Sequence, residues 1–248
     1  MKPLLRAELL KLRTTRTFAA LAGAAIGTSL LITILIAAIT EPTRDEVLLD
    51  VFNSDTSSLF IVFLALLGIG GEWRHRTITS SLLAAPDRLR FLTAKTLAFA
   101  AAGALLSVLI AICVALVGTI ILSARDLPLP GFGEWLEQVG RNAVIAALLG
   151  AFAVGLGAII RNQVVAVIGV LIVWFVLEGA LVALVPEVGK FAPFTALPTS
   201  IADVPPDNAG LPSDADLLSP GAALLALLAW IAAAFSLGAV LLRRRDVN

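Results

Sequence analysis

Charged residues are scarce in this sequence. Asp, Glu, Lys and Arg together make up 15% of its 248 residues, well below the roughly 25% typical of soluble domains. Hydrophobic residues make up 59%, and the mean hydropathy is +0.98. This balance excludes a soluble globular fold and indicates an integral membrane protein.

Cysteine and catalytic motifs are also nearly absent. Cys113 is the only cysteine, so an intrachain disulfide is excluded and the thiol is expected to pack as a small side chain. The chain has no Gly-x-x-x-x-Gly-Lys-Ser/Thr run, which excludes an ATP site of the P-loop kind. It has no His-Glu-x-x-His or Gly-x-Ser-x-Gly sequence either, so nothing supports a metalloenzyme or a hydrolase. We predict that the chain alone is not an enzyme and binds no metal or cofactor of its own.

Six apolar runs are long enough to cross the hydrocarbon core of a bilayer, which takes about 20 helical residues. They cover residues 18–40, 52–71, 97–122, 143–160, 164–185 and 221–242. The second run begins with polar residues from Asn53 to Ser58, so its helix is expected to begin outside the hydrocarbon or to face protein there. A Gly-x-x-x-Gly step at Gly23 and Gly27 in the first run, and Gly150, Gly155 and Gly157 in the fourth, predict close contacts between helices. The sequence therefore predicts an all-α membrane protein in which residues 18–248 form one six-span domain.

Residues 1–17 precede the first span and predict a cytoplasmic interfacial helix. Leu5, Leu9 and Leu12 fall on one helical face, and the basic residues are available for lipid phosphates or partners. The residues singled out in this helix are Arg6, Glu8, Lys11 and Arg13. A simple positive flank of the first span is the alternative.

Basic residues are distributed unevenly between the two sets of alternating segments. Fourteen of the 18 Lys and Arg residues fall in the set that includes both termini, and the other set holds only Arg44, Arg125, Arg141 and Lys190. Lys and Arg near the ends of spans are retained on the cytoplasmic side. We therefore expect a multi-pass protein of the cell (plasma) membrane with both termini in the cytoplasm.

The segment between the second and third spans is longer and richer in polar groups than orientation alone requires. It reads EWRHRTITSSLLAAPDRLRFLTAK over residues 72–95. Gly70 and Gly71 are expected to end the preceding helix, and residues 77–85 are suited to a short helix that Pro86 would end. Such a helix, parallel to the inner surface, would dock into a soluble partner. The alternative is a basic loop that only obeys the positive-inside rule.

This segment resembles the corresponding loop in the membrane subunits of ABC-2 type ATP-binding cassette transporters. The shared features are a glutamate, basic residues, a Thr-Ile step, a Leu-Leu-x-x-Pro turn and an Arg…Lys approach to the third span. Here they fall at Glu72, Arg74, Arg76, Thr77, Ile78, Leu82, Leu83, Pro86, Arg90 and Lys95. The sequence AELLKLRTTR over residues 7–16 is similar to the interfacial helix of that family. Thr77 follows Arg76 where many members carry Gly, so the local turn is expected to differ.

The resemblance implies a permease subunit of an ATP-driven exporter for an amphiphilic or hydrophobic substrate, such as a drug, a lipid or a peptide. In that family the loop contains a coupling helix that sits in a cleft of the ATP-binding subunit. Contact with that subunit would then fall to Glu72, Arg74, His75, Arg76, Thr77, Ile78, Leu82, Leu83 and Pro86. The implied partners are two ATP-binding cassette subunits, a second permease chain in a homodimer or heterodimer, and membrane lipids, with no nucleic acid. ATP and Mg would be bound through the partner subunits.

Glu178 is the only acidic residue well inside an expected span. A carboxylate within a membrane is by default a functional group or one neutralised by protonation or hydrogen bonding. Glu178 is therefore a candidate for the translocation path, with a satisfied packing carboxylate as the alternative.

Two other functions stay open at the level of sequence. One is a non-transporting membrane scaffold or sensor that docks a cytoplasmic partner through the same basic loop. The other is an ion-coupled secondary transporter, against which the few charged residues within the spans argue.

Overall fold

The structure is a computed structural model that describes residues 1–44, 46–74, 87–160 and 162–244. These residues form helices joined by irregular connections and contain no β-strand. Six segments in this part of the chain are long and apolar enough to cross a membrane, which confirms the predicted all-α membrane fold. They are α2 (Arg16–Ile39), the segment Leu48–Glu72 with η1 (Leu48–Phe52) and α3 (Ser57–Arg74), α5 (Arg88–Ala124), α6 (Phe132–Ile159), the segment Gln163–Leu184 with α7 (Gln163–Ile172), η2 (Val173–Glu178) and α8 (Gly179–Leu184), and α11 (Pro220–Arg244).

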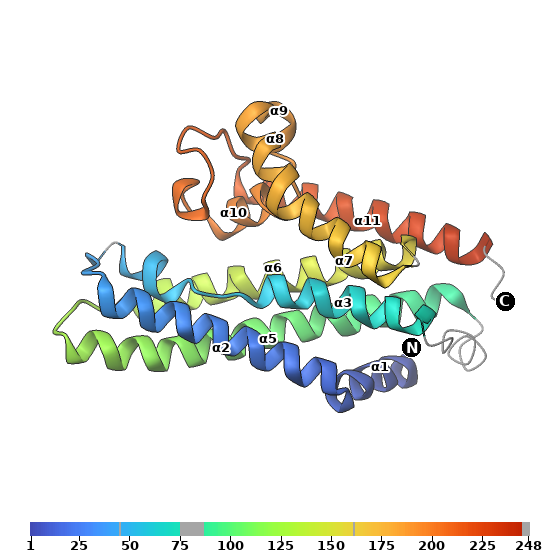
Figure 1. Cartoon of the computed structure of the whole chain (residues 1–248), viewed down its shortest axis with the longest axis horizontal. Helices are drawn as coiled ribbons and strands as arrows, with labels where there is room; N and C mark the ends of the chain where they lie inside the picture. The colour runs from blue at the N-terminus through green and yellow to red at the C-terminus, as the bar shows by residue number, and fades with distance from the viewer. Residues whose placement is uncertain (45, 75–86, 161, 245–248) are drawn as a thin grey trace.

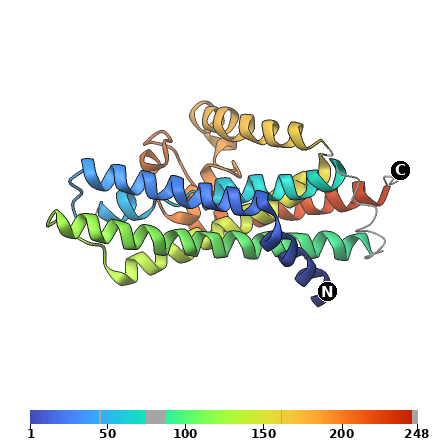
Figure 2. The same ribbon diagram turned by 60° about the horizontal axis from the view of Figure 1, so that its bottom comes forward.

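A further helix, α1 (Lys2–Thr14), precedes the first of these segments. It is separate from α2 because Thr15 between them is extended, with φ −86° and ψ 125°. Figure 2 shows α1 turned away from the axis of α2. α1 packs against α5, and its buried residue is the charged Glu8. The contact of α1 with the bundle therefore depends on a carboxylate as well as on apolar packing.

α6 is the central helix of the bundle, because α3, α5 and α11 all pack on it. Two glycines allow close approach. A Cβ on Gly150 would lie 2.9 Å from the carbonyl oxygen of Phe99 in α5, and a Cβ on Gly155 would lie 2.8 Å from the Cβ of Ala234 in α11. Helices in membranes pack closely where small residues face each other. The prediction of close contacts is confirmed at Gly150 and Gly155, but a Cβ on Gly23 or Gly27 of α2 would meet nothing within 4 Å in this chain.

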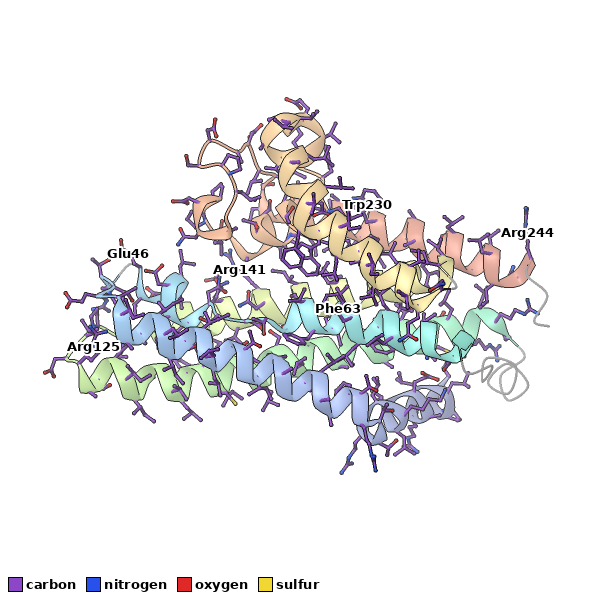
Figure 3. The ribbon with its side chains drawn as sticks, viewed as in Figure 1. Glu46, Phe63, Arg125, Arg141, Trp230 and Arg244 are labelled. Carbon is purple, nitrogen blue, oxygen red and sulfur yellow. The ribbon has the colours of Figure 1, made fainter. Side chains whose placement is uncertain are left out.

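The N-terminus and the end of α11 lie at the same end of the bundle, called the termini end below (Figure 1). Arg88, at the start of α5, donates a hydrogen bond from its guanidinium to the carbonyl oxygen of Leu242 in α11 at this end. The opposite end, called the far end, holds the connections 40–56 and 125–131. In Figure 3, Arg244 marks the termini end, and Glu46 and Arg125 mark the far end.

Two spans begin well before the apolar runs that predicted them. α5 has 37 residues and begins at Arg88 instead of residue 97, because the carboxylate of Asp87 accepts hydrogen bonds from the backbone N–H groups of Leu89 (3.0 Å) and Arg90 (3.2 Å) as an N-cap. α6 has 28 residues and begins at Phe132 instead of residue 143. At 1.5 Å per residue α5 is about 56 Å long, so it extends beyond a hydrocarbon core of about 30 Å.

The second span is not one continuous helix. η1 has π-helical geometry and ends at Phe52, residues 53–56 are unwound, and α3 begins at Ser57. Thr56 is held by α2: its hydroxyl donates to the carbonyl oxygen of Ala25 (3.0 Å), and its N–H donates to the hydroxyl of Ser29 (3.1 Å). The polar start of this span therefore faces protein, which was one of the two alternatives that the sequence predicted.

Residues 185–219 lie beside α8 and α11 and contain three short helices (Figure 1). These are α9 (Pro186–Gly189), α10 (Ala196–Ala202) and η3 (Asp207–Ala209). α10 packs on α11 and α6. The segment therefore forms a folded cap on one side of the bundle.

Candidate functional site

Four charged side chains meet at the termini end: Glu8 and Lys11 of α1, Glu72 of α3 and Lys95 of α5. We call them the charge cluster. Lys95 Nζ lies 2.8 Å from Glu8 Oε2 and 3.0 Å from Glu72 Oε1. Lys11 Nζ lies 2.6 Å from Glu8 Oε1 and 3.2 Å from Glu72 Oε1. Two carboxylates and two ammonium groups thus form a closed and charge-balanced ring that joins three helices.

The charge cluster is largely removed from solvent. The side chains of Lys95, Glu8 and Glu72 are 3%, 8% and 11% exposed, whereas that of Lys11 is 49% exposed. Buried charges are costly unless they are paired. The Lys95 ammonium also lies 5.4 Å from the ring centroid of Phe91 and 5.9 Å from that of Phe99, within the range of cation–π attraction. The Lys95 ammonium is therefore stabilised in its charged form by two carboxylates and two aromatic rings.

Within the charge cluster, the pKa values of Glu8 and Lys11 are shifted in the directions that favour their charged forms. Burial by itself would raise the pKa of Glu8, but the charge of Lys95 and the hydrogen bond from Lys11 outweigh it, so the pKa of Glu8 lies below its ordinary value. Burial would likewise lower the pKa of Lys11, but its hydrogen bond to Glu8 and the charge of Glu72 raise that pKa above its ordinary value. Glu8 and Lys11 are both charged at neutral pH as a result.

Local sequence features place the members of the cluster. Glu8 and Lys11 are three residues apart in α1 and so lie on the same helical face. Glu72 follows Gly70, where the end of α3 comes close to the start of α7. A Cβ on Gly70 would lie 2.8 Å from the Cβ of Gln163, so a larger residue there would push α3 away and displace Glu72 with it.

The ion pairs of the charge cluster connect three helices to one another. Both carboxylates of the charge cluster are paired with ammonium groups. In the part of the chain that the structure describes, no group of three or more His, Cys, Asp and Glu side chains is placed to hold a metal ion. The charge cluster is therefore suited to holding α1, α3 and α5 together.

The structure brings together Glu8, Lys11 and Glu72 from the residues that the sequence singled out. Arg6 and Arg13 are exposed on α1, and Arg74 is the last residue of α3. The other predicted contact residues lie outside the described residues, so the coupling helix stays a prediction. They are His75, Arg76, Thr77, Ile78, Leu82, Leu83 and Pro86.

Lys95 is the most buried member of the cluster. The sequence predicted it only as a positive residue beside the third span and as part of the family pattern, and did not predict its burial. The predicted span begins at residue 97, which places Lys95 in a solvated loop. The sequence nevertheless carries a signal for its burial. Phe91 and Phe99, four residues before and after it, share its helical face, and a lysine on an apolar face requires a partner.

Glu178 ends the π-helical segment η2 and is 2% exposed. Its Oε2 accepts hydrogen bonds from the N–H of Phe194 (2.9 Å), the N–H of Thr195 (2.8 Å) and the hydroxyl of Thr195 (2.9 Å). These donors precede α10, where a carboxylate satisfies free N–H groups and favours the helix dipole. Glu178 therefore fastens the cap to the fifth span, and its role in a translocation path stays a prediction.

No protein-family model matches this sequence, and no curated protein matches it significantly. The class defined by the fold is an all-α protein of transmembrane helical architecture. Its function is inferred below from the residues and geometry of the chain itself.

Proposed function

We propose that this chain is the membrane-spanning permease subunit of an ATP-driven ABC-2 type exporter, and that it forms the path for an amphiphilic or hydrophobic substrate such as a drug, a lipid or a peptide. The observation that supports this most is the charge cluster. The resemblance to the ABC-2 family lies in residues 7–16 and 72–95. The charge cluster joins these two segments through Glu8, Glu72 and Lys95.

The position of the charge cluster explains how force would pass from a partner to the spans. Residues 75–86 connect α3 to α5, and the flanking residues Glu72 and Lys95 form an ion pair of 3.0 Å. Lys95 is paired in turn with Glu8 of α1. Breaking one buried pair costs roughly 3–5 kcal/mol, so a partner that pushes on this connection would move α1, α3 and α5 as one body.

In this proposal the chain crosses the plasma membrane several times, and its termini end faces the cytoplasm. Arg6 and Arg13 of α1 and Arg243 and Arg244 of α11 lie at this end, as the positive-inside rule requires. Two ATP-binding cassette subunits would bind ATP and Mg there. A second permease chain would complete the membrane part.

Purification of the chain in mild detergent, with and without ATP, tests the proposal. A nucleotide-binding protein is expected to co-purify in equal stoichiometry with the chain. Recovery of no such protein under either condition would overturn the proposal. A scaffold or sensor would instead retain a partner that binds no nucleotide, and an ion-coupled transporter would move substrate in vesicles that contain an ion gradient and no ATP.

A variant of the charge cluster tests the coupling step in the purified complex. Lys95→Met is expected to keep the ATP-binding partner but to lose at least tenfold of the substrate-dependent stimulation of its ATPase activity. Lys190→Met is the matched control, because Lys190 pairs with Glu187, which is 84% exposed. Full stimulation in the Lys95 variant, or an equal loss in both variants, would refute the assigned role.

A further inference from the structure

A cavity of about 340 Å³ lies at the far end, where the second span is unwound. Its size is at the lower end of the range for ligand sites, roughly 300–1,000 Å³. Unwound segments within spans are tolerated where they are buried in protein or line a cavity, and in transporters such segments form substrate sites. The lining residues are Ile32 and Ile36 of α2, Leu49 and Asp50 of η1, Asn53, Ser54, Asp55 and Thr56 of the unwound segment, and Asn208 of η3.

The unwound segment is held in place by three neighbouring helices. α2 binds Thr56 as described above. From α5, the hydroxyl of Ser107 donates to Asp55 Oδ2. From α6, the side-chain amides of Gln138 (3.2 Å) and Asn142 (2.9 Å) donate to Asn53 Oδ1. Hydrogen bonds from neighbouring helices therefore fix the positions of Asn53, Asp55 and Thr56 in the wall of the cavity.

Two acidic residues, Asp50 and Asp55, line the cavity. Within the described residues, neither Asp50 nor Asp55 forms an ion pair with a Lys or Arg side chain. The hydrogen bonds to the Asp55 carboxylate come from the neutral donors Ser57 N–H (2.7 Å) and Ser107. Asp50 is half-buried in η1. A buried carboxylate is costly unless it is paired, so a cation bound beside these residues would stabilise their ionised form.

Two arginines of the far end, Arg125 and Arg141, are engaged elsewhere. The guanidinium of Arg125 donates to the carbonyl oxygens of Ala37 (2.5 Å) and Thr40 (2.8 Å). Arg141 pairs with Glu137 (2.7 Å) and with Asp203. Neither of these arginines therefore pairs with Asp50 or Asp55.

The opposite part of the lining is apolar, with Ile32 and Ile36 of α2 and Leu49 of η1. We propose that this cavity binds a small amphiphilic organic cation, with its ammonium group beside Asp50 and Asp55 and its apolar part against Ile32, Ile36 and Leu49. This inference rests on the proposed function only in naming the class of substrate that would be exported. Binding of the cation requires no ATP-binding partner.

Isothermal titration of the full chain in lipid nanodiscs tests the inference, with 1-naphthylmethylammonium as the probe, its neutral counterpart 1-naphthylmethanol for comparison, and empty nanodiscs as the blank. Saturable binding of the cation is expected, with at least tenfold weaker binding of the alcohol. The absence of saturable binding, or equal affinity for cation and alcohol, would overturn the inference.

Two variants locate the site. Asp50→Asn keeps the size of the side chain and is expected to weaken cation binding at least tenfold, whereas Asp214→Asn, an exposed residue outside the cavity lining, should leave it unchanged. Ile36→Phe should reduce binding by filling the cavity while both carboxylates remain. Thermal unfolding confirms that each variant is folded. Unchanged affinity in folded Asp50→Asn and Ile36→Phe chains would place any binding elsewhere and refute the assignment.

These outcomes separate the inference from the proposed function. Cation binding by a chain that never recovers an ATP-binding partner would support the cavity and refute the exporter. Recovery of an ATP-binding partner without cation binding would support the exporter and refute the cation site.

Discussion

Replacing Lys95 by Met removes one ammonium group from the charge cluster and keeps a side chain of similar length. Glu8 and Glu72, which are 8% and 11% exposed, would then share Lys11, which is 49% exposed. Loss of one partner from a buried ion pair costs roughly 3–5 kcal/mol. Because Lys11 still contacts both carboxylates, we expect a loss near the lower end of that range, about 3 kcal/mol.

A second substitution shows whether the loss comes from unpaired charge. Glu8→Gln in the Lys95→Met chain leaves Glu72 with Lys11, one negative and one positive charge. The double variant should therefore be less destabilised than the sum of the single variants, by about 0.5–3 kcal/mol. Reversible unfolding in mixed micelles, titrated with sodium dodecyl sulfate, measures the four free energies.

The control for this cycle is the pair of Lys190 and Glu187, three residues apart, in which the Glu187 side chain is 84% exposed. Glu187→Gln and Lys190→Met are expected to be additive and to change stability little, because water solvates exposed charges almost as well as a partner does. Additive free energies in the cycle of Glu8 and Lys95 would refute the ion-pair reasoning.

Three further predictions concern other positions. Since the pKa of Glu8 lies below its ordinary 4.5, its stabilising contribution is present above that value and is lost as the pH falls through the folded pKa; Glu8→Gln should flatten the acid decline of the unfolding free energy. Gly103→Ala would place a Cβ 2.5 Å from the carbonyl oxygen of Ala146 and should lower the melting temperature, whereas Gly133→Ala, with nothing within 4 Å of its Cβ, should not. Glu178→Ala should speed hydrogen exchange of residues 194–196 and leave α6 protected, because it removes the acceptor at the start of α10; unchanged exchange there would contradict the role assigned to Glu178.

The six spans could be predicted because hydropathy depends on local composition alone. The start of α5 could not be predicted from hydropathy. Residues from Arg88 onward are helical because Asp87 caps them, and Lys95 is buried because Glu8 and Glu72 pair with it. These carboxylates lie 87 and 23 residues away in the sequence, so no local pattern identifies them as partners.

The unwound segment in the second span shows a similar limit. Its polar residues could be recognised in the sequence, and so could the need for them to face protein or water. The partners of Asn53 and Asp55 come from α5 and α6, and the cavity depends on Asn208, more than 150 positions further along the chain. A cavity of this kind arises from tertiary packing and has no signature in a single segment.

α3 connects the charge cluster to the cavity. It begins beside Thr56, which lines the cavity, and it carries Glu72 near its other end. Its 18 residues span about 27 Å, and both ends are bound to neighbouring helices. A shift of Glu72 caused by an ATP-binding partner would therefore move the wall of the cavity, provided that α3 moves as a rigid body.

Linkage makes this connection measurable. If the ATP-bound partner changes the affinity of the cavity for a cation, the cation must change the affinity for that partner state by the same factor. We expect the dissociation constant of 1-naphthylmethylammonium to differ at least fivefold between the chain alone and its complex with the ATP-bound partner. The difference should vanish in Lys95→Met, where α5 is released from Glu8 and Glu72, and should persist in Lys190→Met. Equal cation affinity in the free and complexed wild-type chain would show that the two ends of α3 act independently.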